Sequence, residues 1–242
     1  MGKKSRREKF SPCSFETEIY DEEYEIEINI PSTVPKNDHQ RDYNRVLYGM
    51  KPMVFAVGPA GTGKTMLACY AAIQGLNDDS FKKIILTRPA VSVEEDIGYL
   101  PGTLEEKMDP WTRPIMDIFA EFYSQAQIAS MIKEKIVEIC PLAYMRGRTF
   151  KNSFIIADEM QNSTPNQMKM LLTRIGDDSK MVITGDLRQH DRKYDENGLK
   201  DIYERIKGRT HKRIECITFE HTDIERSPIV KDILDIYGDL KN

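Results

Sequence analysis

The segment that decides the fold, Met53–Ala72, reads MVFAVGPAGTGKTMLACYAA. Its apolar run over residues 53–57 predicts a buried strand, and the small residues from Lys64 onward predict a helix. Between the two lies the turn GPAGTGKT, residues 58–65, which fits the phosphate-binding pattern G-x-x-x-x-G-K-[ST]. A glycine-rich turn that binds nothing is the alternative. It is disfavoured because the strand, the helix and the Lys-Thr pair are all present.

The residue types in this turn predict a site for a nucleoside triphosphate. Glycine permits backbone angles that a Cβ forbids, so successive N–H groups can face a phosphate, and the following helix adds the positive end of its dipole. We expect Lys64 to contact the β- and γ-phosphates and Thr65 to hold Mg²⁺ through its hydroxyl. The predicted contacts with ATP in this segment are Gly58, Pro59, Ala60, Gly61, Thr62, Gly63, Lys64, Thr65 and Met66.

A second apolar run, Phe154–Ala157, is followed by two carboxylates. The C-terminal ends of parallel strands lie at one edge of a sheet, so these carboxylates are expected beside the glycine-rich turn. Asp158 is predicted to hold Mg²⁺ through water, and Glu159 to orient or deprotonate an attacking water. Acidic pairs are common in solvated turns, so this prediction depends on the phosphate-binding turn.

The rest of the chain alternates between strand and helix patterns. Further strands are predicted over residues 84–87, 136–139, 180–185 and 213–218, and helices over residues 37–48, 111–130, 164–175 and 229–237. Thr184, Asp186 and Gln189, at the end of the strand over 180–185, are expected beside the γ-phosphate. This alternation predicts an α/β fold with a mainly parallel central sheet.

Gln40 lies in the helix predicted before the first strand. An amide in this position can donate to and accept from the adenine edge, and Tyr43 could stack on the adenine ring. The alternative is a surface glutamine without a role. We include Gln40 among the predicted nucleotide contacts.

Composition limits the remaining possibilities. The 242 residues carry a net charge of -4 and four cysteines, with no C-x-x-C pair and no apolar membrane or secretory segment. A cytoplasmic protein without a membrane partner is therefore expected. We predict an extension over residues 1–36, basic and then acidic, that is partly disordered or forms an edge strand. An ATPase domain is predicted over residues 37–242.

From residue 37 to about residue 238 the chain resembles the PhoH-like family of P-loop ATPases, which is similar to the motor core of superfamily-one helicases. Seven ordered motifs carry the resemblance: GPAGTGKT (58–65), TRPAV (87–91), GYLPGTLEEKMDPW (98–111), YMRGRTF (144–150), FIIADEMQN (154–162), TGDLRQHD (184–191) and ERSPIV (225–230). The resemblance implies a RecA-like P-loop NTPase, a three-layer αβα sandwich that binds ATP at the C-terminal ends of its strands. Short stand-alone versions also occur in phages.

The resemblance also assigns roles to single residues. The positions for phosphate, Mg²⁺, water and nucleotide-state sensing are occupied by Lys64, Thr65, Asp158, Glu159, Gln189 and Arg226. The family often has Arg-His-Pro where this chain has Arg-Ser-Pro at residues 226–228, so only the arginine and the proline are retained.

A helicase motor takes an arginine from a second RecA-like domain to stabilise charge on the transferring phosphoryl group. This chain has room for one such domain. We therefore expect a head-to-tail homo-oligomer, a hexameric ring by analogy with the family, in which one subunit completes its neighbour's site. The candidate arginines are Arg226, Arg148 and Arg188.

Two classes of function remain open. The first is an ATPase that acts on RNA or single-stranded DNA, although the net charge of -4 weakens this case. The second is a nucleotide-dependent switch or assembly protein that acts on a protein partner. A small-molecule kinase is disfavoured, because Glu159 and the pattern Gly-Asp-x-x-Gln indicate water as the acceptor. The absence of an N-K-x-D pattern favours ATP over GTP.

Overall fold

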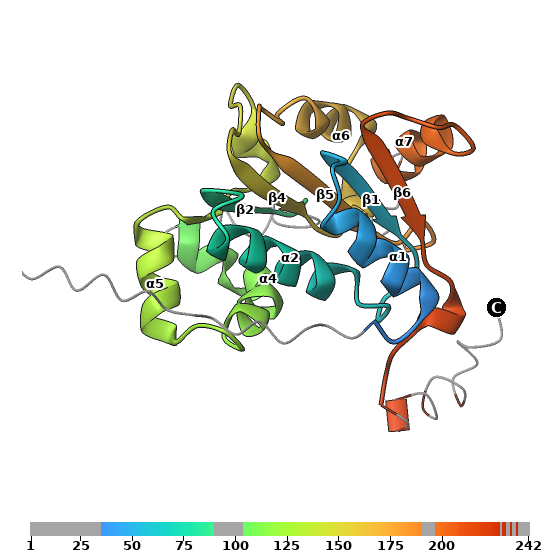
Figure 1. Cartoon of the computed structure of the whole chain (residues 1–242), viewed down its shortest axis with the longest axis horizontal. Coiled ribbons are helices and arrows are strands. Elements are labelled where there is room, and N and C mark those ends of the chain that lie inside the picture. The colour runs from blue at the N-terminus through green and yellow to red at the C-terminus, as the bar shows by residue number, and fades with distance from the viewer. Residues whose placement is uncertain are drawn as a thin grey trace, which may run out of the picture.

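Six parallel strands form the central sheet of the computed structural model, which describes residues 35–89, 104–189 and 197–227 together with residues 229, 230, 233 and 236. The strands lie in the order β3-β2-β4-β5-β1-β6 (Figure 1), and every adjacent pair is parallel. Their bounds are Met53–Val57 (β1), Lys83–Thr87 (β2), Val137–Ile139 (β3), Ser153–Ala157 (β4), Lys180–Gly185 (β5) and Ile214–Thr218 (β6). The predicted parallel α/β sheet is confirmed.

Helices cover both faces of this sheet (Figure 1). One face carries α1 (Asp38–Leu47), α2 (Lys64–Asn77), α4 (Leu104–Phe119) and α5 (Gln125–Lys133). The other carries α6 (Pro165–Leu172) and α7 (Gly198–Ile206), with the short 3-10 turn η1 (Leu142–Met145). The fold is therefore the expected three-layer αβα sandwich of a RecA-like P-loop NTPase.

The side chains of each strand point alternately to the two faces of the sheet, so the central strands contribute to a hydrophobic core on either face. In β4, Phe154 and Ile156 pack with the helices of the first face, whereas Ile155 and Ala157 pack with those of the second. All four side chains are buried, because a parallel sheet covered on both sides has no solvent face. Continuous apolar runs are thus the pattern that this sheet requires.

A buried lysine joins β5 to the end of α1. The Nζ atom of Lys180 donates hydrogen bonds to the carbonyls of Val46, Leu47 and Gly49, at 3.2, 2.5 and 2.7 Å. These carbonyls lie at or just after the C-terminal end of α1, where carbonyls lack the usual helical partners; the Val46 carbonyl also accepts from the N–H of Gly49 at 3.1 Å. Burial lowers the pKa of Lys180 to about 8.

Some predicted helices differ from those observed. The helix expected over residues 111–130 is two helices, α4 and α5, because Ser124 caps the second one and pairs with Gln127 in a capping box. The helix expected over 164–175 ends at Leu172, and α7, which was not predicted, begins after its cap Asn197.

Other predictions concern residues outside the described ranges. They include most of the extension over 1–36, the first part of the GYLPGTLEEKMDPW motif (residues 98–103), the end of the TGDLRQHD motif and most of the helix expected over 229–237. Among the helices of the described ranges, none has the length and apolarity needed to cross a membrane.

Candidate nucleotide-binding site

The glycine-rich turn joins β1 to α2 in a conformation that only glycine adopts freely. Gly58, Gly61 and Gly63 have φ of 143°, 83° and 85°. Gly58 donates its N–H to the carbonyl of Gly185 at 3.1 Å, which ties the turn to the end of β5. A Cβ added at Gly58 would lie 2.4 Å from the carbonyl oxygen of Phe219, so the chain after β6 is packed directly against the turn.

Lys64, the first residue of α2, is 8% exposed and folds back over the turn. Its Nζ atom donates to the carbonyls of Gly58 and Pro59 at 2.8 and 2.6 Å. Burial lowers the pKa of Lys64, and three carboxylates, those of Asp186, Glu159 and Asp158, oppose this shift. The surrounding negative charge therefore favours the ammonium form, the form that binds phosphate.

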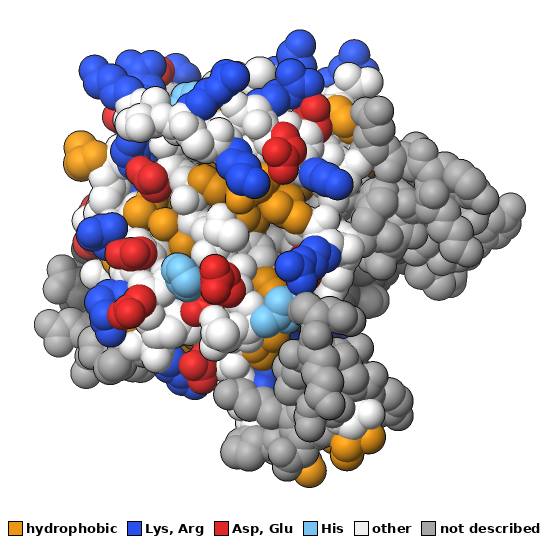
Figure 2. Space-filling view, turned by 90° about the vertical axis from the view of Figure 1, so that its right-hand side faces the viewer, with side chains coloured by type: hydrophobic (Ala, Val, Ile, Leu, Met, Phe, Trp, Pro, Cys, Tyr) orange, Lys and Arg blue, Asp and Glu red, His pale blue; other side chains and the backbone are white. Residues whose placement is uncertain are grey.

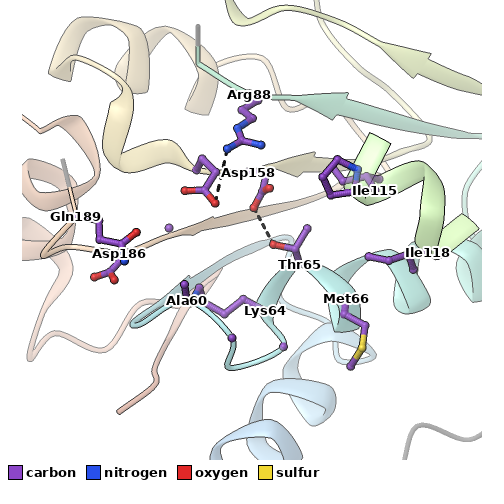
Figure 3. A pocket seen from close by; sticks show the side chains of 15 residues that line it. Ala60, Lys64, Thr65, Met66, Arg88, Ile115, Ile118, Asp158, Asp186 and Gln189 are labelled. Atoms are coloured by element: carbon purple, nitrogen blue, oxygen red, sulfur yellow. Dashed lines mark hydrogen bonds and ion pairs between the residues drawn. The ribbon is translucent and has the colours of Figure 1, made fainter. Parts of the chain in front are cut away.

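Asp158 joins three elements at the edge of the sheet. Its Oδ1 atom accepts hydrogen bonds from the hydroxyls of Thr65, at the start of α2, and Thr184, in β5, at 2.8 and 2.5 Å. The backbone N–H of Asp158 donates to the carbonyl of Thr87 at the end of β2, at 2.9 Å. The contact between Thr65 and Asp158 is drawn in Figure 3. The two predicted Mg²⁺ ligands thus lie together.

Glu159 follows in a strained backbone conformation, with φ of 53° and ψ of 37°. Such left-handed angles cost about 1–3 kcal/mol in a residue other than glycine and are frequent at functional sites. One carboxylate oxygen, Oε1, lies 3.8 Å from Nη2 of Arg88, which follows β2. The other, Oε2, accepts from Nε2 of Gln161 at 2.5 Å. Both sides of the carboxylate are therefore held.

These residues line a cleft of about 450 Å³ at the C-terminal ends of β1, β4 and β5 (Figure 3). Six of the predicted nucleotide contacts line it: Ala60, Gly61, Gly63, Lys64, Thr65 and Met66. Beside them lie Asp158, Glu159, Gly185, Asp186 and Gln189, with Arg88 and three residues of α4, Pro114, Ile115 and Ile118. Segments distant in sequence thus form one cleft with a cation, carboxylates and an apolar wall.

Comparison with known proteins agrees with this geometry. The sequence model of the family described as PhoH-like protein matches residues 32–238. The chain belongs to the PhoH-like family. Proteins of this family are P-loop proteins that bind ATP, in keeping with the RecA-like fold and the cleft at the turn.

Three relatives illustrate the match. A PhoH-like protein of Bacillus subtilis is 42% identical over 238 residues, covering 98% of this chain and 72% of the relative. A PhoH-like protein of Synechocystis is 41% identical over 211 residues, covering 86% and 62%. Protein PhoH of Escherichia coli is 36% identical over 206 residues, covering 84% and 57%. The chain thus spans less than two thirds of the length of the last two relatives.

Other predicted nucleotide contacts of this PhoH-like chain support the turn from behind. Gly58, Pro59 and Thr62 do not line the cleft, and the Thr62 hydroxyl donates to the Pro59 carbonyl at 3.0 Å. Gln40, 3% exposed, donates from Nε2 to the Thr62 carbonyl at 3.1 Å and accepts from the N–H of Lys36 at 2.9 Å. Gln40 therefore braces the turn, and its contact with adenine stays a prediction.

The expectation that Tyr43 stacks on adenine is wrong for this structure. The Tyr43 side chain is fully buried, with an exposed fraction of 0%, and packs edge-on against the Phe219 ring at a centroid distance of 5.6 Å. Its hydroxyl donates to the carbonyl of Lys64 at 3.3 Å. Tyr43 belongs to the core between α1 and α2, because the helical position that faces the turn is taken by Gln40.

The three candidate arginines have different surroundings. Arg226 lies against the glycine-rich turn of the same chain, because a Cβ at Gly61 would be 2.6 Å from the Nε atom of Arg226. Arg188 contacts Nε2 of His221 at 2.9 Å. Arg148 is paired with both carboxylate oxygens of Glu138 and lies over the Phe150 ring, 4.6 Å from its centroid.

Gln161 contacts the predicted base Glu159, and Thr184 contacts the predicted Mg²⁺ ligand Asp158. Gln161 was not assigned a role from the sequence, and Thr184 was expected at the γ-phosphate. Thr184 is instead fully buried beneath Asp158. The signal available for Gln161 was a polar residue two positions after the carboxylate pair, in a segment expected to lead into a helix. That segment is a 3-10 turn, η2 (Met160–Asn162).

Proposed function

We propose that this chain hydrolyses ATP to ADP and phosphate in the cleft, with Mg²⁺ bound at Thr65 and Asp158. The hydrogen bond between these two side chains, 2.8 Å long and next to Glu159, is the observation that carries the proposal. It supports a metal position and a base position side by side at the end of β4. Water would attack the γ-phosphorus, and the bond to the leaving oxygen of ADP would break.

The residues at this position suit Mg²⁺. A hydroxyl and a carboxylate are the hard oxygen donors that Mg²⁺ prefers. Among the described residues, no group of three or more His, Cys, Asp or Glu side chains could hold a metal ion. We therefore expect Mg²⁺ to bind together with the nucleotide, whose phosphates and waters complete its ligands. Bound there, Mg²⁺ would neutralise charge on the phosphates.

The remaining side chains have complementary tasks in this proposal. Lys64 would exchange its bonds to the Gly58 and Pro59 carbonyls for phosphate oxygens, because the ammonium is already within the turn. Glu159 would orient the attacking water and accept its proton. Gln189 lines the same cleft and would contact the γ-phosphate or the water.

Phosphate release by purified protein, with excess Mg²⁺ and with EDTA, tests this proposal. Glu159→Gln should lower kcat about 100- to 10,000-fold with little change in nucleotide affinity, because it removes the base but leaves the phosphate contacts. Lys64→Ala should instead weaken nucleotide binding. Glu204→Gln, on the exposed side of α7, is the matched control. Equal rates for the wild type and Glu159→Gln would refute hydrolysis at this site.

We further propose that the ATPase acts on RNA or single-stranded DNA. Residues 205–213, which join α7 to β6, read RIKGRTHKR and contain five Lys or Arg side chains, in a chain whose net charge is -4. Lys207, Arg209, Lys212 and Arg213 are exposed, and cations gather along the upper edge of the face near β6 (Figure 2). A local basic edge supports contact with a phosphate backbone better than the net charge alone suggested.

ATPase rates with and without single-stranded RNA or DNA, across a salt series, test this second proposal. Stimulation at low salt should be lost when Lys207 and Arg209 are both replaced by Glu. Replacement of both Lys133 and Lys135 by Glu makes the same charge change on exposed residues at and just after the end of α5, at the opposite edge of the sheet, and should leave stimulation intact. No stimulation at low salt would favour the alternative, a nucleotide-dependent switch that acts on a protein partner.

A head-to-tail ring remains part of the proposal, because one RecA-like domain supplies one half of a motor site. Light scattering coupled to size-exclusion chromatography, with and without nucleotide, measures the assembly. A strictly monomeric protein with full ATPase activity would refute the ring.

A further inference from the structure

Gln161 connects the ends of two central strands. It is 2% exposed and lies in η2, the turn that comes after the carboxylate pair following β4. Its Oε1 atom accepts from the backbone N–H of Asp186, after β5, at 3.1 Å. Its Nε2 atom donates to Oε2 of Glu159 at 2.5 Å. One side chain therefore contacts both the predicted base and the strand that leads to the γ-phosphate side of the cleft.

The two contacts fix the orientation of the amide. The Asp186 backbone N–H can only donate, so the Gln161 atom facing it must be the oxygen. The amide nitrogen then faces Glu159, whose ionised carboxylate can only accept. No other side chain of this length combines one acceptor and one donor without a charge. A glutamate here would place a second carboxylate against Glu159.

The glycine at the end of β5 leaves space for this amide. A Cβ added at Gly185 would lie 2.5 Å from Oε1 of Gln161. The absence of a side chain at the last position of β5 is thus what lets the amide reach between the strands. On the far side of the carboxylate, Arg88 lies 3.8 Å from Oε1 of Glu159.

We propose that Gln161 is a positioning residue for ATP hydrolysis: it holds the Glu159 carboxylate in place and links it to the end of β5. Glu159 needs such support, because its left-handed backbone angles alone do not fix the side chain. The inference rests on the proposed hydrolysis and adds to it a residue that touches neither nucleotide nor metal. It also gives a physical path from the Asp186–Gln189 segment to the base.

Steady-state ATPase kinetics and nucleotide binding on the full chain test this inference. Gln161→Met keeps the length of the side chain but loses both hydrogen bonds. It should lower kcat about 10- to 100-fold, the cost of a misplaced catalytic group, and change nucleotide affinity less than about threefold. The matched control is Gln167→Met, which removes a glutamine whose Oε1 accepts a backbone N–H, that of Thr164, at 2.9 Å in the capping box of α6. Its kcat should stay near that of the wild type.

A double-mutant cycle separates positioning from a purely structural role. In the Glu159→Gln background the base is already lost, so Gln161→Met should cost less than about threefold more. An equally large loss in both backgrounds, or a kcat for Gln161→Met equal to that of the control, would overturn the inference. If wild type and Glu159→Gln hydrolyse at equal rates, the proposed hydrolysis itself fails, and this inference with it.

Gln161→Glu provides a second route if the Met variant does not fold. It keeps the acceptor for the Asp186 N–H, so the strand contact survives, but it replaces the donor that holds Glu159. Its kcat should fall by at least about tenfold at neutral pH. Because the new carboxylate is buried against Glu159, the melting temperature will also fall, so kcat is compared at a temperature at which circular dichroism shows the variant folded. Wild-type kcat in this variant would overturn the inference without the Met variant.

Discussion

Arg226→Ala tests whether this arginine serves its own nucleotide site or that of a neighbouring subunit. The Arg226 side chain lies against Gly61 of the same chain, with Nε 2.6 Å from the position that a Cβ would take. The preceding residue, Glu225, donates its N–H to the Gly61 carbonyl at 3.0 Å. Both contacts hold the arginine on its own glycine-rich turn, so we expect it to act within one subunit.

The expected loss follows from what the guanidinium can reach. From this position it can donate to phosphate oxygens at the turn, and removal of one preorganised donor to developing charge costs about 100- to 1,000-fold in kcat. Phosphate release by Arg226→Ala should therefore fall by that factor. Thermal melting should change little, because the side chain is exposed.

A mixing experiment distinguishes the two arrangements. Arg226→Ala and Lys64→Ala chains are co-expressed with different tags and purified on both tags, so that only mixed assemblies are assayed. If Arg226 acts within its own subunit, no site in the mixture is complete and activity stays at the level of the two variants. If it acts across subunits, roughly a quarter of the interfaces regain both residues. Recovery to about that fraction of wild-type activity would refute the reasoning.

Three further predictions concern buried groups. Tyr43→Phe removes the hydroxyl that donates to the Lys64 carbonyl, and it should change ATP affinity less than about twofold in a titration with fluorescent nucleotide, because this side chain belongs to the core; a large loss would mean that the hydroxyl contributes to nucleotide binding. Thr184→Val removes a hydrogen bond to Asp158, so the Mg²⁺ concentration for half-maximal hydrolysis should rise about tenfold; an unchanged Mg²⁺ titration would contradict this. The folded-state pKa of Lys180 is lowered from 10.5 to about 8, so the unfolded chain binds more protons in between. The free energy of unfolding, measured with urea at pH 7.5 and 9.5, should therefore rise by about 1–2 kcal/mol more for the wild type than for Lys180→Met. An equal change in both proteins would contradict the lowered pKa of Lys180.

Much of the fold follows from local pattern. The apolar runs of β1, β4 and β5 were predicted within a residue or two, because a short continuous apolar run that ends in turn residues is the pattern of a strand buried on both faces. The break between α4 and α5 was missed although Ser124 and Gln127 form a capping box that the sequence displays. Apolar spacing on both sides of the break hid it. The order of the strands in the sheet depends on how helices and strands from distant parts of the chain pack together. The sequence pattern of a single segment does not contain this information.

The candidate site was likewise predicted only in part. The sequence predicted that Lys64, Thr65, Asp158 and Glu159 lie in one cleft, because the C-terminal ends of the strands in a parallel sheet lie at the same edge. The contacts that support these residues could not be predicted from the sequence. Gln161, for example, contacts Asp186 only because β4 and β5 are neighbours in the folded sheet. Tyr43 was misassigned for a related reason: one turn of α1 separates a residue facing the glycine-rich turn from one facing the core.

Gly58 has a consequence for how the family's sequences are compared. A side chain there would collide with the Phe219 backbone, and the φ of 143° is open to glycine alone among common residues. The fold itself therefore demands this glycine, whether or not a nucleotide is bound. A relative without ATPase activity would still be constrained to keep it. Retention of the first glycine of the motif thus reports on the architecture. Under the proposed hydrolysis, Lys64, Asp158 and Glu159 are the positions that would report on catalysis.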